Sequence, residues 1–368
     1  MTLPRLTAIP ADIAAVTDYE PYARERLDDN AWAYIASGAG DEITHHANRG
    51  AFDALSLNAR VLADVRGGST ALELFGQRFA HPIMIAPVAY QRLAHPDGEL
   101  ATVQAAAALE AGMMVSTLAS CRLEDIARYA GAPLWFQLYI QPDRGFTREL
   151  VQRAEAAGYS ALVVTVDAPI AGIRNREQRA RFHLPQGISA VNLQGMRAPQ
   201  PTLPPGASQV FDGLMAYAAT WKDIEQLRGL TRLPLILKGI LYPDDAELAL
   251  AHGVDGIVVS NHGGRTLDTL PASLHALPAI AERVAGRAPL LLDGGIRRGT
   301  DVIKALALGA SAVLVGRPWL YGLATAGALG VAHVLRLLRD ELEVGMALTG
   351  CARLGDIGPH LIHKIKEI

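Results

Sequence analysis

The sequence has little of what marks several classes of protein. Two cysteines occur among 368 residues, and Cys121 and Cys351 form no CxxC pattern and no metal-ligand spacing. We therefore expect two small buried thiols, no disulfide scaffold and no metal site. The formal net charge is only −3, which leaves no overall basic surface for nucleic acid. These shortages argue against a disulfide-rich, a metal-binding and a nucleic-acid-binding protein.

Long apolar segments are also lacking. The first 18 residues include Asp12 and no long apolar core, so they do not resemble a signal peptide. No stretch approaches the roughly 18 uncharged apolar residues that a membrane-spanning helix needs. The sequence therefore predicts a soluble, cytoplasmic protein without membrane insertion.

What the sequence does contain is a repeated pattern of short apolar runs. Each run ends in a polar or glycine-bearing turn and is followed by a helical stretch rich in alanine and leucine. Runs that are apolar on both faces suit parallel strands covered by helices. Eight such repeats predict an α/β fold, a (β/α)8 TIM barrel; a doubly wound sheet is disfavoured because nothing like GxGxxG follows the first run. The runs are 83–86, 113–116, 134–137, 162–165, 235–238, 257–260, 290–293 and 313–316.

The rest of the chain is expected to complete one domain, 1–368. Residues 1–80 form an N-terminal helical extension with a β-like stretch around 72–79, and 81–350 form the barrel. Residues 185–215 have little periodicity and contain Pro199-Gln200-Pro201 and Pro204-Pro205-Gly206. A long loop of this kind is typical of an active-site lid or a disordered insert. We expect a mobile loop over the barrel mouth.

One strand end carries a distinctive group of residues. The run from Ser260 to Arg265, SNHGGR, follows a buried apolar stretch. His262 can take a proton near neutral pH, and Arg265 can hold a carboxylate with two parallel bonds. Gly263 and Gly264 allow a tight turn and a close approach to a ligand. The hypothesis is deprotonation of an acid-bearing substrate beside its carboxylate; the alternative is a turn whose polar residues are merely surface groups.

Polar residues follow other strands too, and barrel enzymes place their chemistry at these carboxyl ends. The last two strand ends combine glycines with cations, which suits a phosphate monoester bound by backbone N–H groups. A phosphorylated cofactor is therefore implied, extending toward Lys238 and His262. The polar strand-end residues are Gln137, Tyr139, Thr165, Asp167, Lys238, Asp293, Gly294, Gly295, Arg297, Gly316 and Arg317.

Together these residues carry a family resemblance that covers nearly the whole chain. The sequence resembles the FMN-dependent α-hydroxy-acid oxidases and dehydrogenases, the group of glycolate oxidase, lactate oxidase, mandelate dehydrogenase and the flavin domain of flavocytochrome b2. The motifs occur in the family's order. They are YIASG at 34–38, IAP at 85–87, FQLY at 136–139, TVD at 165–167, LKG at 237–239, SNHG at 260–263, DGGIRRGTD at 293–301 and GRP at 316–318.

The resemblance implies roles for the catalytic and substrate-binding residues. His262 would be the general base, and Asp167 would stabilise the imidazolium that forms. Arg265 and Arg174 would clamp the substrate carboxylate with help from Tyr34. Tyr139 would bind near the substrate hydroxyl.

The resemblance also implies FMN and the residues that hold it. Lys238 would lie by the N1/O2 edge of the flavin. The remaining residues would contact the flavin face and ring, the ribityl chain and the phosphate. They are Ala86, Pro87, Val88 and Ala89 on one face; Ser116, Gln137, Thr165 and Ser260 near the ring; Asp293 at the ribityl chain; and Gly294, Gly295, Arg297, Gly316 and Arg317 at the phosphate.

Two positions depart from glycolate oxidase. Leu118 stands where that enzyme carries a tryptophan in the substrate pocket, so the pocket should admit a side chain larger than hydrogen. Tyr90 stands where it carries a methionine, and adds a hydroxyl to the site or simply packs.

The predicted function is FMN-dependent oxidation of an L-2-hydroxy acid to the 2-oxo acid, with O₂ re-oxidising the flavin to give H₂O₂. Lactate and longer-chain or aromatic acids such as mandelate are the expected substrates. The alternative is a dehydrogenase linked to a quinone or another carrier; the polar residues Gln194, Arg197 and Gln200 in the long loop favour the soluble oxidase. The family is usually tetrameric or octameric, so we expect a homo-oligomer.

Two other classes of protein fit the sequence less well. Inosine-monophosphate-dehydrogenase-like barrels share the phosphate signature at 293–296 but need a nucleophilic cysteine on a barrel loop, and neither cysteine fits. A non-enzymatic flavin-binding protein would have no use for His262, Arg265 and Arg174 together.

Overall fold

The computed structural model describes residues 2–197 and 203–363 and contains a closed barrel of eight parallel strands. The strands follow one another around the barrel in chain order, and the last pairs with the first. Each coincides with one of the predicted apolar runs, so the (β/α)8 prediction is confirmed. The strands are β3 (Ile83–Ile85), β4 (Met113–Ser116), β5 (Leu134–Leu138), β6 (Leu162–Thr165), β7 (Leu235–Ile240), β8 (Gly256–Val259), β9 (Leu290–Asp293) and β10 (Ala312–Val315).

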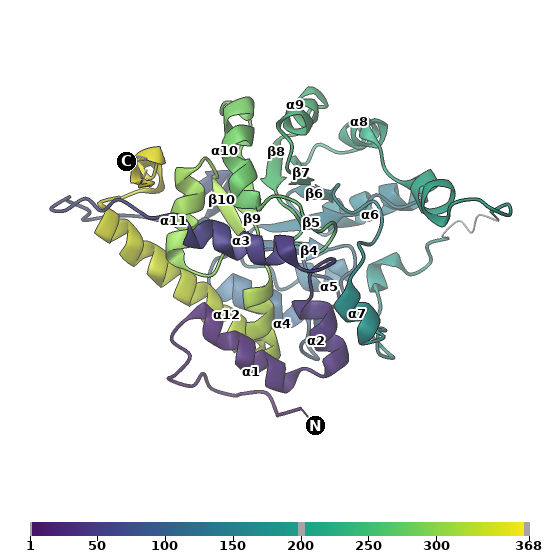
Figure 1. Cartoon of the computed structure of the whole chain (residues 1–368), viewed down its shortest axis with the longest axis horizontal. Helices are drawn as coiled ribbons and strands as arrows, with labels where there is room; N and C mark the ends of the chain where they lie inside the picture. The colour runs from purple at the N-terminus through teal and green to yellow at the C-terminus, as the bar shows by residue number, and fades with distance from the viewer. Residues whose placement is uncertain (1, 198–202, 364–368) are drawn as a thin grey trace.

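The outer ring consists of helices whose apolar faces cover the strands (Figure 1). In α6, for example, Asp143 caps the first turn by accepting from the backbone N–H of Gly145 and Phe146, and Leu150 and Val151 are buried. Such a cap satisfies N–H groups that have no partner within the helix. The helices are α4 (Glu99–Ala108), α5 (Leu123–Ala127), α6 (Arg144–Ala156), α8 (Trp221–Leu230), α9 (Pro243–Ala251), α10 (Ser273–Val284), α11 (Gly299–Ala307) and α12 (Arg317–Thr349).

Helix α12 does not meet the expectation that long apolar segments are lacking. Among the described residues it is the one helix long and apolar enough to cross a membrane by length and composition, with a mean hydropathy of 1.3 over its best window. Of that window, 61% is buried, and α12 packs against α1, α4 and α11. Its apolar character comes largely from leucines and valines scattered among smaller residues, so no bulky run is continuous, and the backbone is non-helical at Ala326 and Gly327. Its burial is that of a core helix.

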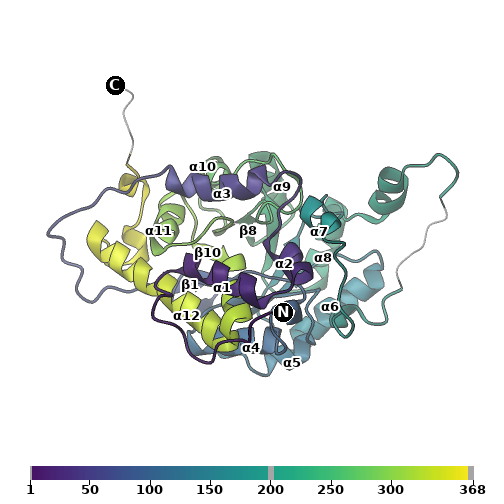
Figure 2. The same cartoon turned by 60° about the horizontal axis from the view of Figure 1, so that its bottom comes forward.

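The N-terminal extension packs onto the barrel as helices and a hairpin. Helix α3 lies beside α10, and α1 lies along α12, in both views (Figures 1 and 2). The antiparallel strands β1 and β2 put Leu74 and Phe79 against the apolar barrel interior. The chain enters the barrel at β3 and completes it at α12, within the predicted 81–350. The extension's elements are η1 (Val16–Asp18), α1 (Tyr19–Arg26), α2 (Asp29–Ala36), α3 (Ile43–Asp53), β1 (Leu72–Leu74) and β2 (Gln77–Phe79).

The segment between β6 and α8 projects from the side of the barrel (Figure 2). It contains α7 (Asn175–Arg179), η3 (Val191–Leu193), η4 (Gln209–Gly213) and η5 (Leu214–Tyr217). Residues 198–202, including the predicted Pro199-Gln200-Pro201 stretch, lie outside the described residues. The described parts of 185–215 therefore contain short helical turns; the mobility of this loop stays a prediction. Three more short turns are η2 (Gln91–Leu93), η6 (Leu354–Asp356) and η7 (Pro359–Leu361).

Candidate active site

The period of the strands determines which residues reach the barrel mouth. A layer of inward apolar side chains, including Met84, Met114, Val163 and Leu291, fills the barrel interior. Because side chains alternate between the two faces of a strand, the residue two positions later points inward again, one layer higher. This second layer is polar or small in every strand. It consists of Ala86, Ser116, Gln137, Thr165, Lys238, Ser260, Asp293 and Gly316.

This polar layer forms the floor of a cavity of about 190 Å³, the inner cavity. The sequence predicted 20 of its lining residues, and Asp167 and Ser260 lie directly behind it, bonded to His262 and Lys238. The structure thus brings together residues from the N-terminal extension and from the carboxyl ends of all eight strands or the loops that follow them. The predicted residues that line it are Tyr34, Ala86, Pro87, Val88, Ala89, Ser116, Leu118, Gln137, Tyr139, Thr165, Arg174, Lys238, His262, Arg265, Asp293, Gly294, Gly295, Arg297, Gly316 and Arg317.

The imidazole of His262 is hydrogen-bonded to the side chain of Asp167. Its Nδ1 lies 2.9 Å from Asp167 Oδ1. Burial raises the pKa of Asp167, but the contact with His262 and the charge of Lys238 outweigh burial and leave this pKa below its usual range. Asp167 is therefore a carboxylate that accepts the Nδ1 proton, which assigns the tautomer with Nε2 as the free acceptor. An imidazole oriented in this way is a competent general base.

The turn that carries His262 depends on left-handed backbone geometry. His262, Gly263 and Gly264 have φ values of 58°, 63° and 73°. A Cβ on Gly264 would lie 2.6 Å from the backbone nitrogen of His45, so this position requires glycine. The sequence analysis expected these glycines to let the backbone approach a ligand closely. At Gly264 the backbone instead approaches helix α3 of the N-terminal extension.

Lys238 is buried and makes two polar contacts. Its Nζ lies 3.0 Å from Asp293 Oδ2 and donates to Ser260 Oγ at 2.9 Å. Burial lowers the pKa of Lys238, but the charges of Asp293 and Asp167 outweigh it and raise the pKa, so the side chain is cationic. Asp293 Oδ1 is buried and has no hydrogen-bond donor among the described residues. An acceptor in this state is available to a ligand hydroxyl or N–H.

Two cations meet where β9 and β10 end. Burial, followed by the charges of Arg265 and Arg297, lowers the pKa of Arg317 to about 9, and burial lowers the pKa of Arg297. Within the described ranges neither guanidinium has a carboxylate partner; Arg317 donates to backbone oxygens of Gly263 and Ser37. Buried cations without an anion destabilise each other, and a phosphate would relieve this.

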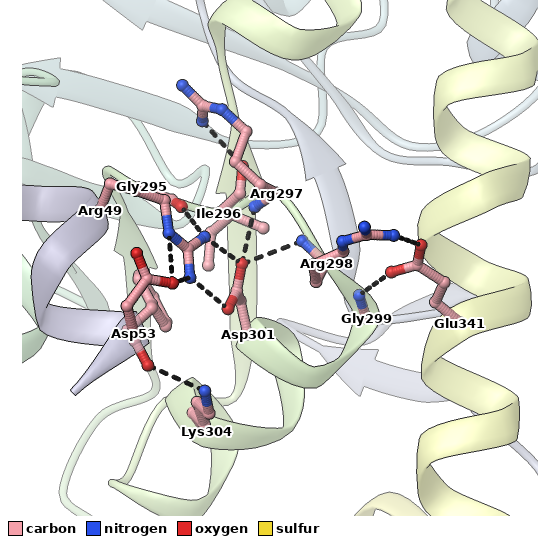
Figure 3. Close-up of polar contacts among 11 residues, drawn as sticks. Arg49, Asp53, Gly295, Ile296, Arg297, Arg298, Gly299, Asp301, Lys304 and Glu341 are labelled. Atoms are coloured by element: carbon pink, nitrogen blue, oxygen red, sulfur yellow. Dashed lines mark hydrogen bonds and ion pairs between the residues drawn. The ribbon is translucent and has the colours of Figure 1, made fainter. Parts of the chain in front are cut away.

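A polar network holds the loop that carries Arg297 (Figure 3). Asp301, which is buried, accepts from the backbone N–H of Arg297 at 2.8 Å and of Arg298 at 2.9 Å. Arg49 of α3 donates to Asp301 at 2.6 Å and to the backbone oxygen of Gly295 at 2.9 Å. The N-terminal extension therefore fixes the anion-binding loop from behind.

The two predicted clamp arginines share a carboxylate that the sequence analysis missed. Arg174 Nη1 donates to Glu177 Oε1 at 2.8 Å and to Oε2 at 3.1 Å, and Arg265 Nη2 donates to Oε1 at 3.2 Å. Arg265 Nη1 also donates to the backbone oxygens of Tyr34 and Ser37, both at 2.7 Å. The spacing of Arg174 and Glu177, three residues apart at a helix start, was the available signal for this pair.

Leu118 stands between the inner cavity and a larger outer chamber of about 750 Å³. Tyr139, Arg174 and His262 also line both spaces. Tyr90 packs instead against Tyr34, with ring centroids 6.0 Å apart. The outer chamber is largely apolar, with Ile140, Val166, Ile170, Trp221, Ile224 and Ile240 among its lining residues.

Comparison with known proteins agrees with this geometry. The family model described as FMN-dependent dehydrogenase matches residues 23–364. The chain belongs to the FMN-dependent dehydrogenase family. An L-lactate oxidase of Alicycliphilus denitrificans is 50% identical over 350 residues, covering 95% of this chain and 96% of that protein. Glycolate oxidase 3 of Arabidopsis thaliana is 44% identical over 348 residues, covering 94% and 95%. A mandelate oxidase solved with benzoyl-formic acid has a TM-score of 0.87 at 41% identity, covering 96% of this chain and 99% of that one.

The inner cavity of this FMN-dependent dehydrogenase fits the cofactor that the family requires. The unpartnered Asp293 Oδ1 suits a ribityl hydroxyl, and Arg297 and Arg317 suit the phosphate. Ser116 Oγ donates to Gln137 Oε1 at 3.1 Å, and Gln137 Nε2 donates to Thr165 Oγ1 at 3.0 Å. This chain of polar groups crosses the floor where the ring would lie.

Proposed function

We propose that this chain oxidises an L-2-hydroxy acid to the 2-oxo acid with FMN, and that O₂ then takes the electrons and yields H₂O₂. The observation that carries the proposal is that His262, hydrogen-bonded to Asp167 behind it, lines the same cavity as Arg174, Arg265 and Tyr34. An imidazole base beside two cations suits a substrate whose hydroxyl and carboxylate are on adjacent carbons.

The chain's own residues bind the substrate and move its proton. Arg174 and Arg265 bind the carboxylate, which places the neighbouring carbon and hydroxyl before His262. His262 accepts the substrate proton at Nε2, and Asp167 stabilises the resulting imidazolium. FMN, when bound, takes up the two electrons of the oxidation and passes them on. Tyr139, whose pKa is raised by burial, keeps its proton and donates a hydrogen bond to the substrate oxygen.

Oxygen as the electron acceptor is supported by the names of the relatives, which are oxidases of L-lactate and of 2-hydroxy acids. The second candidate is a dehydrogenase that passes electrons to a quinone or another carrier. In both cases the substrate loses two electrons and two protons; in the oxidase O₂ receives both and becomes H₂O₂.

A visible spectrum of the purified holoenzyme tests the proposal. L-lactate added without air should bleach the flavin band, and admitting air should restore it with one H₂O₂ formed per pyruvate. Bleaching that air does not reverse would favour the carrier-linked dehydrogenase. If no 2-hydroxy acid bleaches the flavin, the proposal fails.

Substrate size is expected to depend on Leu118. We propose that lactate and longer aliphatic or aromatic 2-hydroxy acids place their side chains past Leu118 toward the outer chamber, where each buried methylene contributes about 0.8 kcal/mol. Leu118→Trp should fill this space and shift preference toward glycolate by roughly 10- to 200-fold, the range of a hydrophobic pocket. The measurement is kcat/KM for glycolate, L-lactate, 2-hydroxyoctanoate and mandelate in both proteins.

The control for this experiment is Leu3→Trp, because Leu3 lies in the N-terminal extension, is 50% accessible and lines neither cavity. It makes the same substitution far from the cavity and should leave the order of substrates unchanged. Glycolate as the best wild-type substrate would show that Leu118 does not determine the pocket.

We further propose a cytoplasmic enzyme that assembles as a homotetramer or homo-octamer. The free, buried thiols of Cys121 and Cys351 are consistent with a reducing compartment. Exposed apolar side chains on α12, Leu329, Val344 and Leu348, support association between copies. Cell fractionation and light scattering test the two statements separately.

A further inference from the structure

The ring of Tyr34, which lines the inner cavity, is packed against other side chains. Phe182 stacks on it, with ring centroids 4.7 Å apart and ring planes inclined by 18°. The guanidinium carbon of Arg265 lies 5.1 Å from the centre of the Tyr34 ring. Arg265 also lines the inner cavity, whereas Phe182 lines neither the inner cavity nor the outer chamber. An effect of the Phe182 side chain on the substrate would therefore pass through Tyr34.

Phe182 is itself held in place, because the segment after α7 is attached to α2. The backbone N–H of Phe182 donates to the backbone oxygen of Glu177 at 2.9 Å. The next residue, His183, exchanges two hydrogen bonds with Asn30: its N–H donates to Asn30 Oδ1 at 3.1 Å, and Asn30 Nδ2 donates to its backbone oxygen at 2.9 Å. Asn30 and Tyr34 are four residues apart on α2, so they lie on one face of the helix. That face holds the segment at two neighbouring points.

The position of the Tyr34 ring matters because its hydroxyl is a hydrogen-bond donor. Burial raises the pKa of Tyr34 and outweighs the charges of Arg265 and Arg174, which lower it. The hydroxyl therefore keeps its proton and can donate to a carboxylate bound by the two arginines. A donor of this kind contributes to binding only when its ring is held in the correct place. Stacked aromatic rings stabilise each other beyond the area that they bury.

We propose that Phe182 is a positioning residue, which holds the Tyr34 ring beside Arg265 by stacking on it and so increases the affinity of the site for the substrate carboxylate. The inference rests on the proposed function and adds a residue to carboxylate binding. His262 is oriented by Asp167 and not by this stack. Proton transfer from a bound substrate is therefore expected to be independent of Phe182, and the stack acts on binding.

The test replaces Phe182 with leucine, which stays apolar but cannot stack. Pyruvate is titrated into the oxidised holoenzyme and followed by the change in flavin absorbance, and the limiting rate of flavin reduction is measured at saturating L-lactate without air. The Kd for pyruvate should rise roughly 2- to 12-fold, the equilibrium equivalent of one aromatic pair. The limiting rate should stay within about twofold of the wild type, as expected for a loss of binding alone. An unchanged Kd overturns the proposal, and so does a limiting rate that falls in parallel with binding, because that result indicates a general loosening of the site.

Two further variants test the route through Tyr34. Phe182→Tyr keeps a ring that can stack and should restore the Kd to near the wild-type value. In Tyr34→Leu the stack is already lost, so adding Phe182→Leu should change the Kd for pyruvate little further. Residues that act through a contact between them give such non-additive effects. If the two substitutions are additive, or if Phe182→Tyr binds pyruvate as weakly as Phe182→Leu, Phe182 does not act by stacking on Tyr34.

The matched control is Phe75→Leu. Phe75 is also half-buried and paired with another ring, that of Trp135, with centroids 5.6 Å apart, but it lines neither the inner cavity nor the outer chamber. This variant should leave the Kd and the limiting rate unchanged. An equal rise in Kd in both leucine variants would overturn the specific role of Phe182. Failure of the proposed function would look different, because the wild-type flavin would then not be bleached by any 2-hydroxy acid.

Discussion

Replacing His262 with alanine is expected to slow flavin reduction by 2-hydroxy acids by roughly 10²- to 10⁴-fold, the contribution of a positioned general base. The variant should retain FMN, because the residues assigned to the phosphate and the ribityl chain lie at the ends of β9 and β10. His262 has Asp167 at Nδ1, and we find no second base of this kind among the described residues lining the inner cavity. Anaerobic stopped-flow measurement of the flavin band gives the rate.

The control variant removes an exposed histidine outside the inner cavity. His275 is exposed on α10, and His275→Ala should reduce its flavin at the wild-type rate. If the flavin of His262→Ala is also reduced at the wild-type rate, His262 is not the general base.

Arg265→Lys is expected to raise the Kd of 2-hydroxy and 2-oxo acids by roughly 10- to 100-fold, the equivalent of a charge-assisted hydrogen bond of about 1.5–3 kcal/mol. The Arg265 guanidinium binds two backbone oxygens and Glu177 at once. An ammonium cannot reproduce this planar fork and also bind a carboxylate. Titration of pyruvate into the oxidised holoenzyme measures the Kd directly.

Arg174→Lys should also weaken binding, because both arginines approach one carboxylate. Arg153→Lys is the control, since Arg153 pairs with Glu124 outside the site. Unchanged Kd values in both site variants would contradict the clamp.

Much of the site could be predicted because the chemistry of a barrel mouth follows strand periodicity. The residue two positions after each inward apolar side chain points inward again, so Gln137, Lys238 and Asp293 were identifiable from the ends of apolar runs. The His262 turn and the glycine-rich ends of β9 and β10 are local features, and local sequence is sufficient to specify them. These local patterns were sufficient to predict the barrel, the polar layer and a phosphorylated cofactor, and the family resemblance added FMN.

Other features depend on side chains that meet only when distant segments fold together. Glu177 looks like an ordinary solvated residue of a short helix until Arg265, 88 positions away, is placed beside it. Arg49 and Asp301, 252 positions apart, give no pairing signal in one sequence, although they fix the anion-binding loop. The apolar stretch of α12 is read as a core helix only because α1, α4 and α11 cover it. These features became visible only in the tertiary structure, because burial and long-range ion pairs depend on which surfaces pack together. The order of residues along the chain does not contain that information.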